Sequence, residues 1–283
     1  MKNKEIFLLH LAVMLFGLAG IISKFVSLPA VIVTFGRVFF SSIFLLIIIL
    51  VKKEKILLAN KQDYALMIIA GVIMAIHWFT FLQTIQMSTV AIGTITFSTF
   101  PIFVTFLEPI IYKERLRLKD IVLALIMFLG ILITIPEFTL DNQVTLAIII
   151  GLIGSLSYAF LCLMNRYFSS RYSGRIICLY EQGVAAIILF PVLFIIKVIP
   201  TATDLLALIF LGIVCTALAH SIYVNSLKKV KVQTAGIISG METVYSIVFA
   251  YILLKETLGV RELFGGLIIF GVALYSSIVK DKI

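Results

Sequence analysis

Long apolar runs separated by short polar segments fill this chain from end to end. A bilayer core about 30 Å thick needs about 20 apolar residues per helix, and ten runs of that size can be counted. The connections between them are short. The pattern predicts an all-α membrane protein with ten transmembrane helices. Their ranges are roughly 6–24, 30–51, 64–85, 90–112, 118–136, 144–165, 175–197, 204–226, 232–254 and 259–279.

The second half of the chain repeats the first at an offset of 142 residues. The segment KERL at 113–116 is equivalent to KETL at 255–258, and Phe16 is equivalent to Tyr158. We therefore predict two five-helix repeats, residues 6–136 and residues 143–279. Because five is an odd number, the second repeat enters the membrane from the opposite face, so the two repeats are inverted. Inverted repeats are typical of alternating-access carriers.

Composition supports a membrane protein and argues against a soluble one. Hydrophobic residues make up 62% of the chain and charged residues 13%, with a mean hydropathy of +1.19, whereas about a quarter of the residues are charged in soluble domains. The net charge of +9 would suit nucleic acid, but the basic residues lie in short clusters between apolar runs. Such clusters are orientation signals in a bilayer, so the expected partner is the lipid bilayer and not nucleic acid.

The lysines and arginines also predict which way the chain crosses the membrane. Of the 23 basic residues, 18 lie in the N-terminus, after the second, fourth, sixth and eighth spans, or in the C-terminus. Four lie on the opposite side, and Arg37 is inside a span. Basic residues gather on the cytoplasmic side of membrane proteins. The expected location is the inner membrane, with both termini in the cytoplasm and the oligomeric state left open.

Two pairs of motifs resemble a known transporter family. METV at 241–244 followed by LKETL at 254–258 resembles the pattern Leu-Glu-Pro-Val and Gly-Glu-Arg-Leu of the EamA group in the drug/metabolite transporter superfamily, and FPI at 100–102 with KERL at 113–116 stands at the matching places. The resemblance runs from end to end. Phe100 and Thr243 depart from it, since they replace a carboxylate and a proline. The resemblance implies transport of a small metabolite without specifying which one.

Ionisable side chains inside the spans are candidates for function, because each costs roughly 2.5–3.5 kcal/mol at the centre of a helix on insertion scales. Glu242, in the middle of the ninth span, is expected to carry a proton or to pair with a substrate amine, or else to make a packing hydrogen bond. Glu108 is a second proton-coupling candidate, although it could extend to the interface. Arg37 requires a partner, either a substrate carboxylate or an internal one. Glu181 lies deep in the seventh span and is, with Glu242 and Arg37, a candidate for lining a substrate cavity.

Several aromatic and histidine side chains are expected around a central cavity. In the family that the chain resembles, spans 1, 3, 4, 6, 8 and 9 surround such a cavity, and Tyr245 continues the face of Glu242. An aromatic wall would bind an organic cation or stack on an aromatic metabolite. Any single aromatic could instead be a packing residue. The further candidates are His77, Trp78, Phe81, Tyr158, His220 and Tyr223.

The fourth span contains two prolines, Pro101 and Pro109. Each removes a backbone donor and clashes with the preceding turn, so a kink is expected. A kinked span is a candidate gate, although passive kinks also occur at prolines in membrane helices.

Together these patterns predict a secondary active transporter of a small organic metabolite, such as an amino acid or amine. It would work by alternating access and couple to protons or to the substrate gradient. A lipid or lipid-linked-sugar flippase is the first alternative and should show a lateral opening with a wide polar groove. A non-transporting scaffold or sensor is the second. No enzymatic activity is expected because the serines lack a base at recognisable spacing, and neither a cofactor nor a metal is expected.

Overall fold

The computed structural model describes residues 2–112, 118–136, 139–227 and 232–279, and within these residues every regular element is a helix. Seven helical segments are long and apolar enough to cross a membrane by length and composition. Shorter apolar helices cover Ile121–Thr134 and Ile238–Leu254. With the last helix, these segments give the ten predicted spans, so the protein is an all-helical, multi-pass membrane protein.

Six spans are single helices and four are interrupted. The bounds are α1 (Lys2–Lys24), α2 (Ala30–Val51), α3 (Lys61–Met87), α4 and α5 (Val90–Phe97 and Phe100–Tyr112), α6 (Leu118–Thr134), α7 (Gln143–Ser169), α8 and α9 (Gly174–Leu189 and Val192–Ile195), α10 and α11 (Ala202–Gly212 and Ala219–Leu227), α12 (Val232–Phe249) and α13 (Val260–Val279). A π-helical stretch, Ile213–Leu218, joins α10 to α11, and a second, Ala250–Leu254, follows α12. Such insertions are frequent at functional sites.

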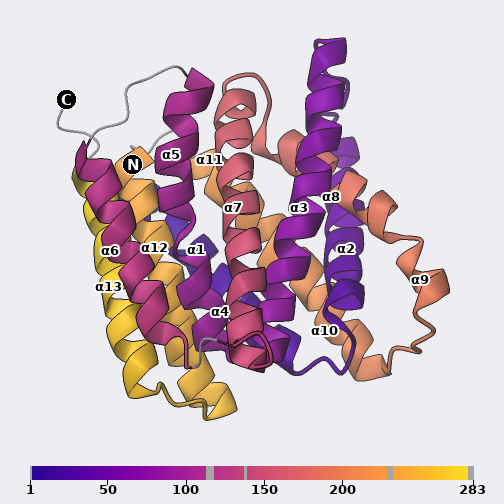
Figure 1. Cartoon of the computed structure of the whole chain (residues 1–283). Coiled ribbons are helices and arrows are strands. Elements are labelled where there is room, and N and C mark those ends of the chain that lie inside the picture. The colour runs from indigo at the N-terminus through magenta and orange to yellow at the C-terminus, as the bar shows by residue number, and fades with distance from the viewer. Residues whose placement is uncertain (1, 113–117, 137–138, 228–231, 280–283) are drawn as a thin grey trace.

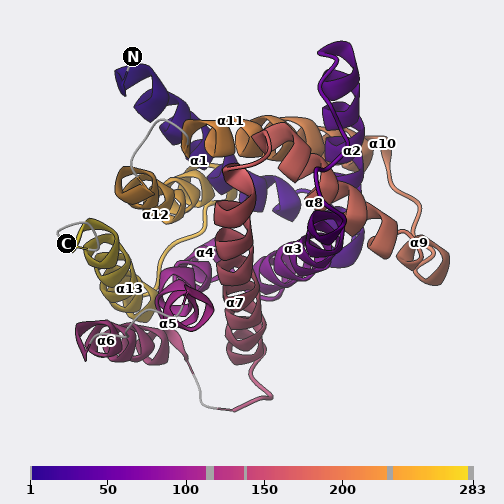
Figure 2. The same cartoon turned by 90° about the horizontal axis from the view of Figure 1, so that it is seen from above.

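Helix packing follows the duplication. The offset makes α1 equivalent to α7, α3 to α10 and α11, and α4 with α5 to α12. In the first pair of equivalent contacts, α1 packs against α11 and α7 packs against α3. In the second, α1 packs against α12, and α7 packs against both α4 and α5. The equivalent pairs α2 with α8 and α6 with α13 contact each other directly. Figure 2 shows these two pairs on opposite sides of the bundle.

Equivalent helices run in opposite directions. In Figure 1, α5 ends at the upper end of the bundle, whereas its equivalent, α12, continues to the connection with α13 at the lower end. The connection between α7 and α8 lies at the upper end, and the start of α1 and the end of α13 lie toward that end (Figure 1). The two repeats are therefore inverted, as the odd number of spans predicts.

The expected kink in the fourth span is a complete break at Ser98 and Thr99, which separates α4 from α5. Pro101 explains it, because its ring clashes with the carbonyl four residues earlier, on Phe97, and it has no N–H to donate. That carbonyl instead accepts a hydrogen bond from the Ser155 hydroxyl on α7 at 2.8 Å. Pro109 lies inside α5 without ending it.

Polar contacts hold the lower end of α4 to the rest of the bundle. The Glu256 carboxylate accepts from the backbone N–H of Val90 at 3.0 Å, in the first turn of α4. The Lys24 ammonium, at the end of α1, donates to the carbonyl of Ser88 at 2.7 Å. A carboxylate at a helix N-terminus also interacts favourably with the helix dipole. These contacts tie α1, α4 and the segment after α12 together at that end.

Candidate functional site

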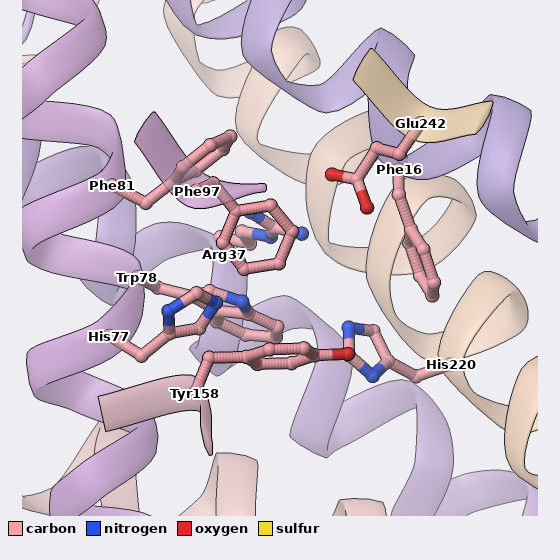
Figure 3. Close-up of a pocket in the computed structure, with 9 residues that line it drawn as sticks. All are labelled: Phe16, Arg37, His77, Trp78, Phe81, Phe97, Tyr158, His220 and Glu242. Carbon is pink, nitrogen blue, oxygen red and sulfur yellow. The ribbon is translucent and has the colours of Figure 1, made fainter. Parts of the chain in front are cut away.

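A small cavity lies among α1, α2, α3, α4, α7, α11 and α12, close to the centre of the bundle. Its volume is about 30 Å³, which is the room of about two water molecules. The lining side chains come from both repeats and converge on one space (Figure 3). They are Phe16, Arg37, His77, Trp78, Phe81, Phe97, Tyr158, His220 and Glu242.

Arg37, on α2, is the cation of this cavity and is only 3% exposed. Its Nε donates to the Thr216 hydroxyl at 2.6 Å, and its guanidinium carbon lies 4.0 Å from the centroid of the Trp78 ring. Thr216 sits in the π-helical stretch after α10 and donates in turn to the carbonyl of Leu211 at 2.7 Å. Ring stacking and one hydrogen bond therefore hold the guanidinium, since planar Arg stacks well on aromatic faces.

Glu242, on α12, is the acidic side chain of the same cavity. Its carboxylate points into the space that the Arg37 guanidinium also faces (Figure 3). The ion pairs found among the described residues do not include Arg37 with Glu242, so no nitrogen of one lies within 4.0 Å of an oxygen of the other. Buried charges are normally paired. This cavity instead holds a basic and an acidic side chain that face each other without direct contact.

Aromatic rings and two histidines form the remaining wall. Tyr158 lies 4.8 Å from His77 and 4.9 Å from Phe97 between ring centroids, and His220 lies 4.6 Å from Phe16. His77 Nδ1 is 3.0 Å from the carbonyl of Gly154. Because a carbonyl only accepts, Nδ1 carries the hydrogen and Nε2 is left as an acceptor. The wall thus consists of rings packed against one another, with a few polar atoms among them.

Three predicted candidates lie outside this wall. The Tyr245 hydroxyl is 2.8 Å from His10 Nδ1 and joins α12 to α1. The Tyr223 hydroxyl is 2.7 Å from the Ser239 hydroxyl and joins α11 to α12. Their rings pack beside Phe16 and do not line the cavity. Glu181 lies in a separate buried cluster on α8.

Glu108 is also away from the cavity. It forms an ion pair with Arg166, whose side chain is 60% exposed. The pair links α5 to α7 near the upper end of the bundle. This is the interfacial position that the sequence left open for Glu108, and an exposed pair of this kind contributes little to stability.

Phe16 and Phe97 line the cavity without having been predicted to do so. Phe16 is equivalent to Tyr158 at the offset of 142 residues, so the duplication itself paired it with a predicted lining residue. Phe97 is the last residue of α4 and reaches the cavity because the helix breaks directly after it. In the sequence, Pro101 indicates the helix break but not which side chain faces the cavity.

The two charges come from different repeats and have no charged equivalents. Adding the offset, Arg37 corresponds to residue 37 + 142 = 179, which is Leu179, and Glu242 corresponds to residue 242 − 142 = 100, which is Phe100. Phe100 packs against Tyr158 at 4.8 Å. The cavity is therefore chemically asymmetric although the fold around it is symmetric. Within the described residues, no three His, Cys, Asp or Glu side chains gather as metal ligands do.

Ten spans in two inverted halves around a charged, aromatic cavity define a multi-pass membrane transporter of small molecules. The EamA-like transporter family matches residues 3–135 and, a second time, residues 145–278, and the chain belongs to this family. The resemblance that the motifs indicate is thus confirmed, and with it membership of the drug/metabolite transporter superfamily.

Two further similarities agree with this assignment. A protein of Archaeoglobus fulgidus, described as an uncharacterized transporter, is 25% identical over 190 residues, which are 67% of this chain and 68% of that protein. A solved crystal structure, described only as that of a protein, aligns over 100% of both chains with a TM-score of 0.70 and 14% identity. At that identity the second similarity shows a shared fold.

Proposed function

We propose that this protein is a secondary active transporter of a small zwitterionic metabolite of the amino-acid class. It carries an ammonium and a carboxylate group together across the inner membrane by alternating access, with both termini in the cytoplasm. One observation carries the proposal: Arg37 and Glu242 face the same cavity and do not pair with each other.

The charges of the cavity match those of a zwitterion. A guanidinium presents a planar fork of donors that suits a carboxylate, and the Glu242 carboxylate suits an ammonium. A molecule with both groups would pair each charge and leave the site neutral. An amine alone would leave Arg37 uncompensated, and a carboxylic acid alone would leave Glu242 uncompensated. An unpaired charge in a buried site is costly, so both single-charge ligands are disfavoured.

The cavity must open for this substrate to enter. Its volume of about 30 Å³ is far below the roughly 300–1,000 Å³ of ordinary ligand pockets. The break between α4 and α5 supports such opening, because discontinuous helices commonly line the sites of carriers with inverted repeats. We take the two repeats, residues 6–136 and 143–279, as the units that rearrange.

Coupling to protons is proposed through Glu242. A carboxylate that binds the substrate ammonium can bind a proton once the substrate has left, so substrate and proton would occupy Glu242 in turn. Glu108 is paired with Arg166 and does not line the cavity, so we assign it no place in this step.

A lipid flippase fits the surface of the molecule less well. A groove of about 370 Å³ lies between α2 and α8. Its lining is apolar except for Ser42, whose hydroxyl donates to the carbonyl of Phe39 at 2.9 Å. A lipid-linked sugar would need a groove with polar groups for its head. The second alternative, a scaffold or sensor, makes no use of the charged cavity.

The test is a counterflow assay in proteoliposomes with matched competitors. Amino acids are compared with the amines and the carboxylic acids that lack one of the two charged groups. We expect saturable exchange of at least one amino acid and at least tenfold weaker competition by both truncated analogues. The variant Arg37→Gln should lose this preference over the amine. Equal competition by the amine and the amino acid in the wild-type protein would overturn the proposal, and an absence of saturable flux would favour the scaffold.

A further inference from the structure

A second buried polar cluster lies beside the cavity, between α7 and α8. Glu181, on α8, is 1% exposed and lies beside the Asn165 side chain of α7. One oxygen of each side chain, Glu181 Oε1 and Asn165 Oδ1, is buried without a hydrogen-bond partner. The ion pairs of the described residues do not include Glu181. Two acceptors thus point into the protein interior without a donor.

The cluster lies closer to the upper end of the bundle than the cavity does. Glu181 is seven residues from the start of α8 and Asn165 four residues from the end of α7, which are roughly 10 Å and 6 Å at 1.5 Å per residue. Glu242 is ten residues from the start of α12, roughly 15 Å by the same measure. The α7–α8 connection, at the upper end in Figure 1, marks the side toward which the cluster is displaced.

Polar side chains connect the cavity to this cluster. Tyr158, Cys162 and Asn165 are spaced by four and three residues and so share one face of α7. The Tyr158 hydroxyl lies at the cavity (Figure 3), and the Cys162 thiol lies near it on the same face of α7. Cys162 and Cys178 both lie close enough to Glu181 to interact with it electrostatically. Polar side chains therefore lie between the cavity wall and Glu181.

We propose that Glu181 and Asn165 form a second binding site for an alkylammonium group, occupied by the substrate amine between the central cavity and the face that carries the termini. This inference rests on the proposed function, because it adds a step to the same route. A buried acceptor without a donor costs roughly 1–3 kcal/mol. An ammonium group offers three donors and a positive charge, so it satisfies Glu181 Oε1 and Asn165 Oδ1 together.

The second site differs from the cavity in what it selects. The cavity contains Arg37, which disfavours an amine without a carboxylate. Among the described residues, no cationic side chain forms an ion pair with Glu181. An amine without a carboxylate is therefore not disfavoured at this site. Ethylammonium is therefore a suitable probe, because it lacks a carboxylate and should bind at Glu181 more readily than in the cavity.

The experiment measures equilibrium binding of labelled ethylammonium to the purified full chain in detergent at neutral pH. The Glu242→Gln variant lacks the acidic group of the cavity and should retain one class of binding sites for ethylammonium. Adding Glu181→Gln to it should weaken ethylammonium binding at least tenfold. Adding Glu54→Gln instead, the same change in a connection outside the spans, should leave binding unchanged. Thermal unfolding of each variant reports whether it is folded.

The variant Glu181→Asp keeps the proposal testable if the glutamine variant fails to fold. Aspartate keeps the carboxylate on a shorter side chain. This variant should therefore bind ethylammonium measurably, but more weakly than the protein that retains Glu181. Two results would overturn the inference. One is no ethylammonium binding in Glu242→Gln protein, as expected if a proton alone occupies Glu181. The other is equal binding with and without Glu181. The counterflow assay with amino acids is independent of both, so it tests the proposed function separately.

Discussion

The hydroxyl of Ser155 donates to the carbonyl oxygen of Phe97 at 2.8 Å, and in doing so it joins the two repeats at the broken span. The carbonyl is available because Pro101, four residues later, cannot bond to it. On the opposite side of the break, the Ser98 and Thr243 hydroxyls lie 2.5 Å apart. The Ser155 hydroxyl of α7 thus replaces a hydrogen bond that the helix itself has lost, and the contact between Ser98 and Thr243 joins α12 to the same break.

Removing the Ser155 hydroxyl should therefore destabilise the protein more than removing an ordinary helical hydroxyl. Ser155→Ala leaves the Phe97 carbonyl buried without this donor, which costs roughly 1–3 kcal/mol. A lower midpoint of thermal unfolding in detergent is expected. Ser157→Ala is the matched control, because that hydroxyl bonds to Ile153 of its own helix. Equal midpoints for the two variants would show that the contact with Phe97 does not stabilise the break.

Arg37→Lys should behave as a severe substitution although the charge is kept. Lysine has no planar group to stack on Trp78 at 4.0 Å and no Nε to bond to Thr216, and an ammonium is not equivalent to a guanidinium at a stacked site. We expect the affinity for the transported amino acid to fall roughly 10- to 100-fold, that is by about 1.4–2.8 kcal/mol. Competition binding measures it, and an unchanged affinity would remove Arg37 from the substrate site.

Glu242→Gln should abolish the dependence of uptake on external pH. The amide is close in shape to the carboxyl group but can neither release a proton nor carry a charge. Uptake into membrane vesicles is compared between about pH 5.5 and 8, two limits that bracket neutral pH on either side. The amount of folded protein in the membrane is measured in parallel. Transport that keeps its pH profile in this variant would exclude Glu242 as the proton carrier.

A pair of residues outside the spans should make stability sensitive to acid. Partial burial raises the pKa of Glu54, but the hydrogen bond and charge of Arg175 outweigh it and lower the pKa below its usual 4.5. The folded state thus holds the proton less tightly than the unfolded state. The stabilisation is present above pH 4.5 and is lost as the pH falls through the lowered pKa. Thermal unfolding should depend less on pH below 4.5 in Glu54→Gln than in the wild type.

Cysteine labelling tests the proposed orientation. Single cysteines at Lys55 and Asp141 replace exposed residues in connections at opposite ends of the bundle, with the three native cysteines removed. In intact cells, a reagent that does not cross the membrane should label Asp141→Cys and spare Lys55→Cys. The reverse pattern would place the termini outside.

The spans and the duplication could be predicted because both depend on local hydrophobicity, which a bilayer imposes on every segment alike. Arg37 and Glu242 could be predicted because a charge in that environment is rare enough to stand out. Phe97 could not, since aromatic residues make up 12% of the chain and the rotation of each helix decides which of them face inward.

Helical spacing alone does not predict which residues line the cavity. Tyr245 lies three residues after Glu242 and was expected to share its face. Its hydroxyl instead lies 2.8 Å from His10 Nδ1 on α1, outside the cavity. Glu181 was predicted to line the cavity from its depth alone. Its actual partner, Asn165, comes from a different helix, and only the packing of α7 against α8 brings the two together.

The distribution of Arg37 and Glu242 has a consequence for how such a site can arise. A homodimer of first halves would bury two guanidinium groups against each other, and a homodimer of second halves would bury two carboxylates. Like charges in a low-dielectric interior repel strongly. Fusion of the two halves into one polypeptide lets each specialise, and the fixed places of Arg37 and Glu242 would hold the proposed zwitterionic substrate in a single orientation.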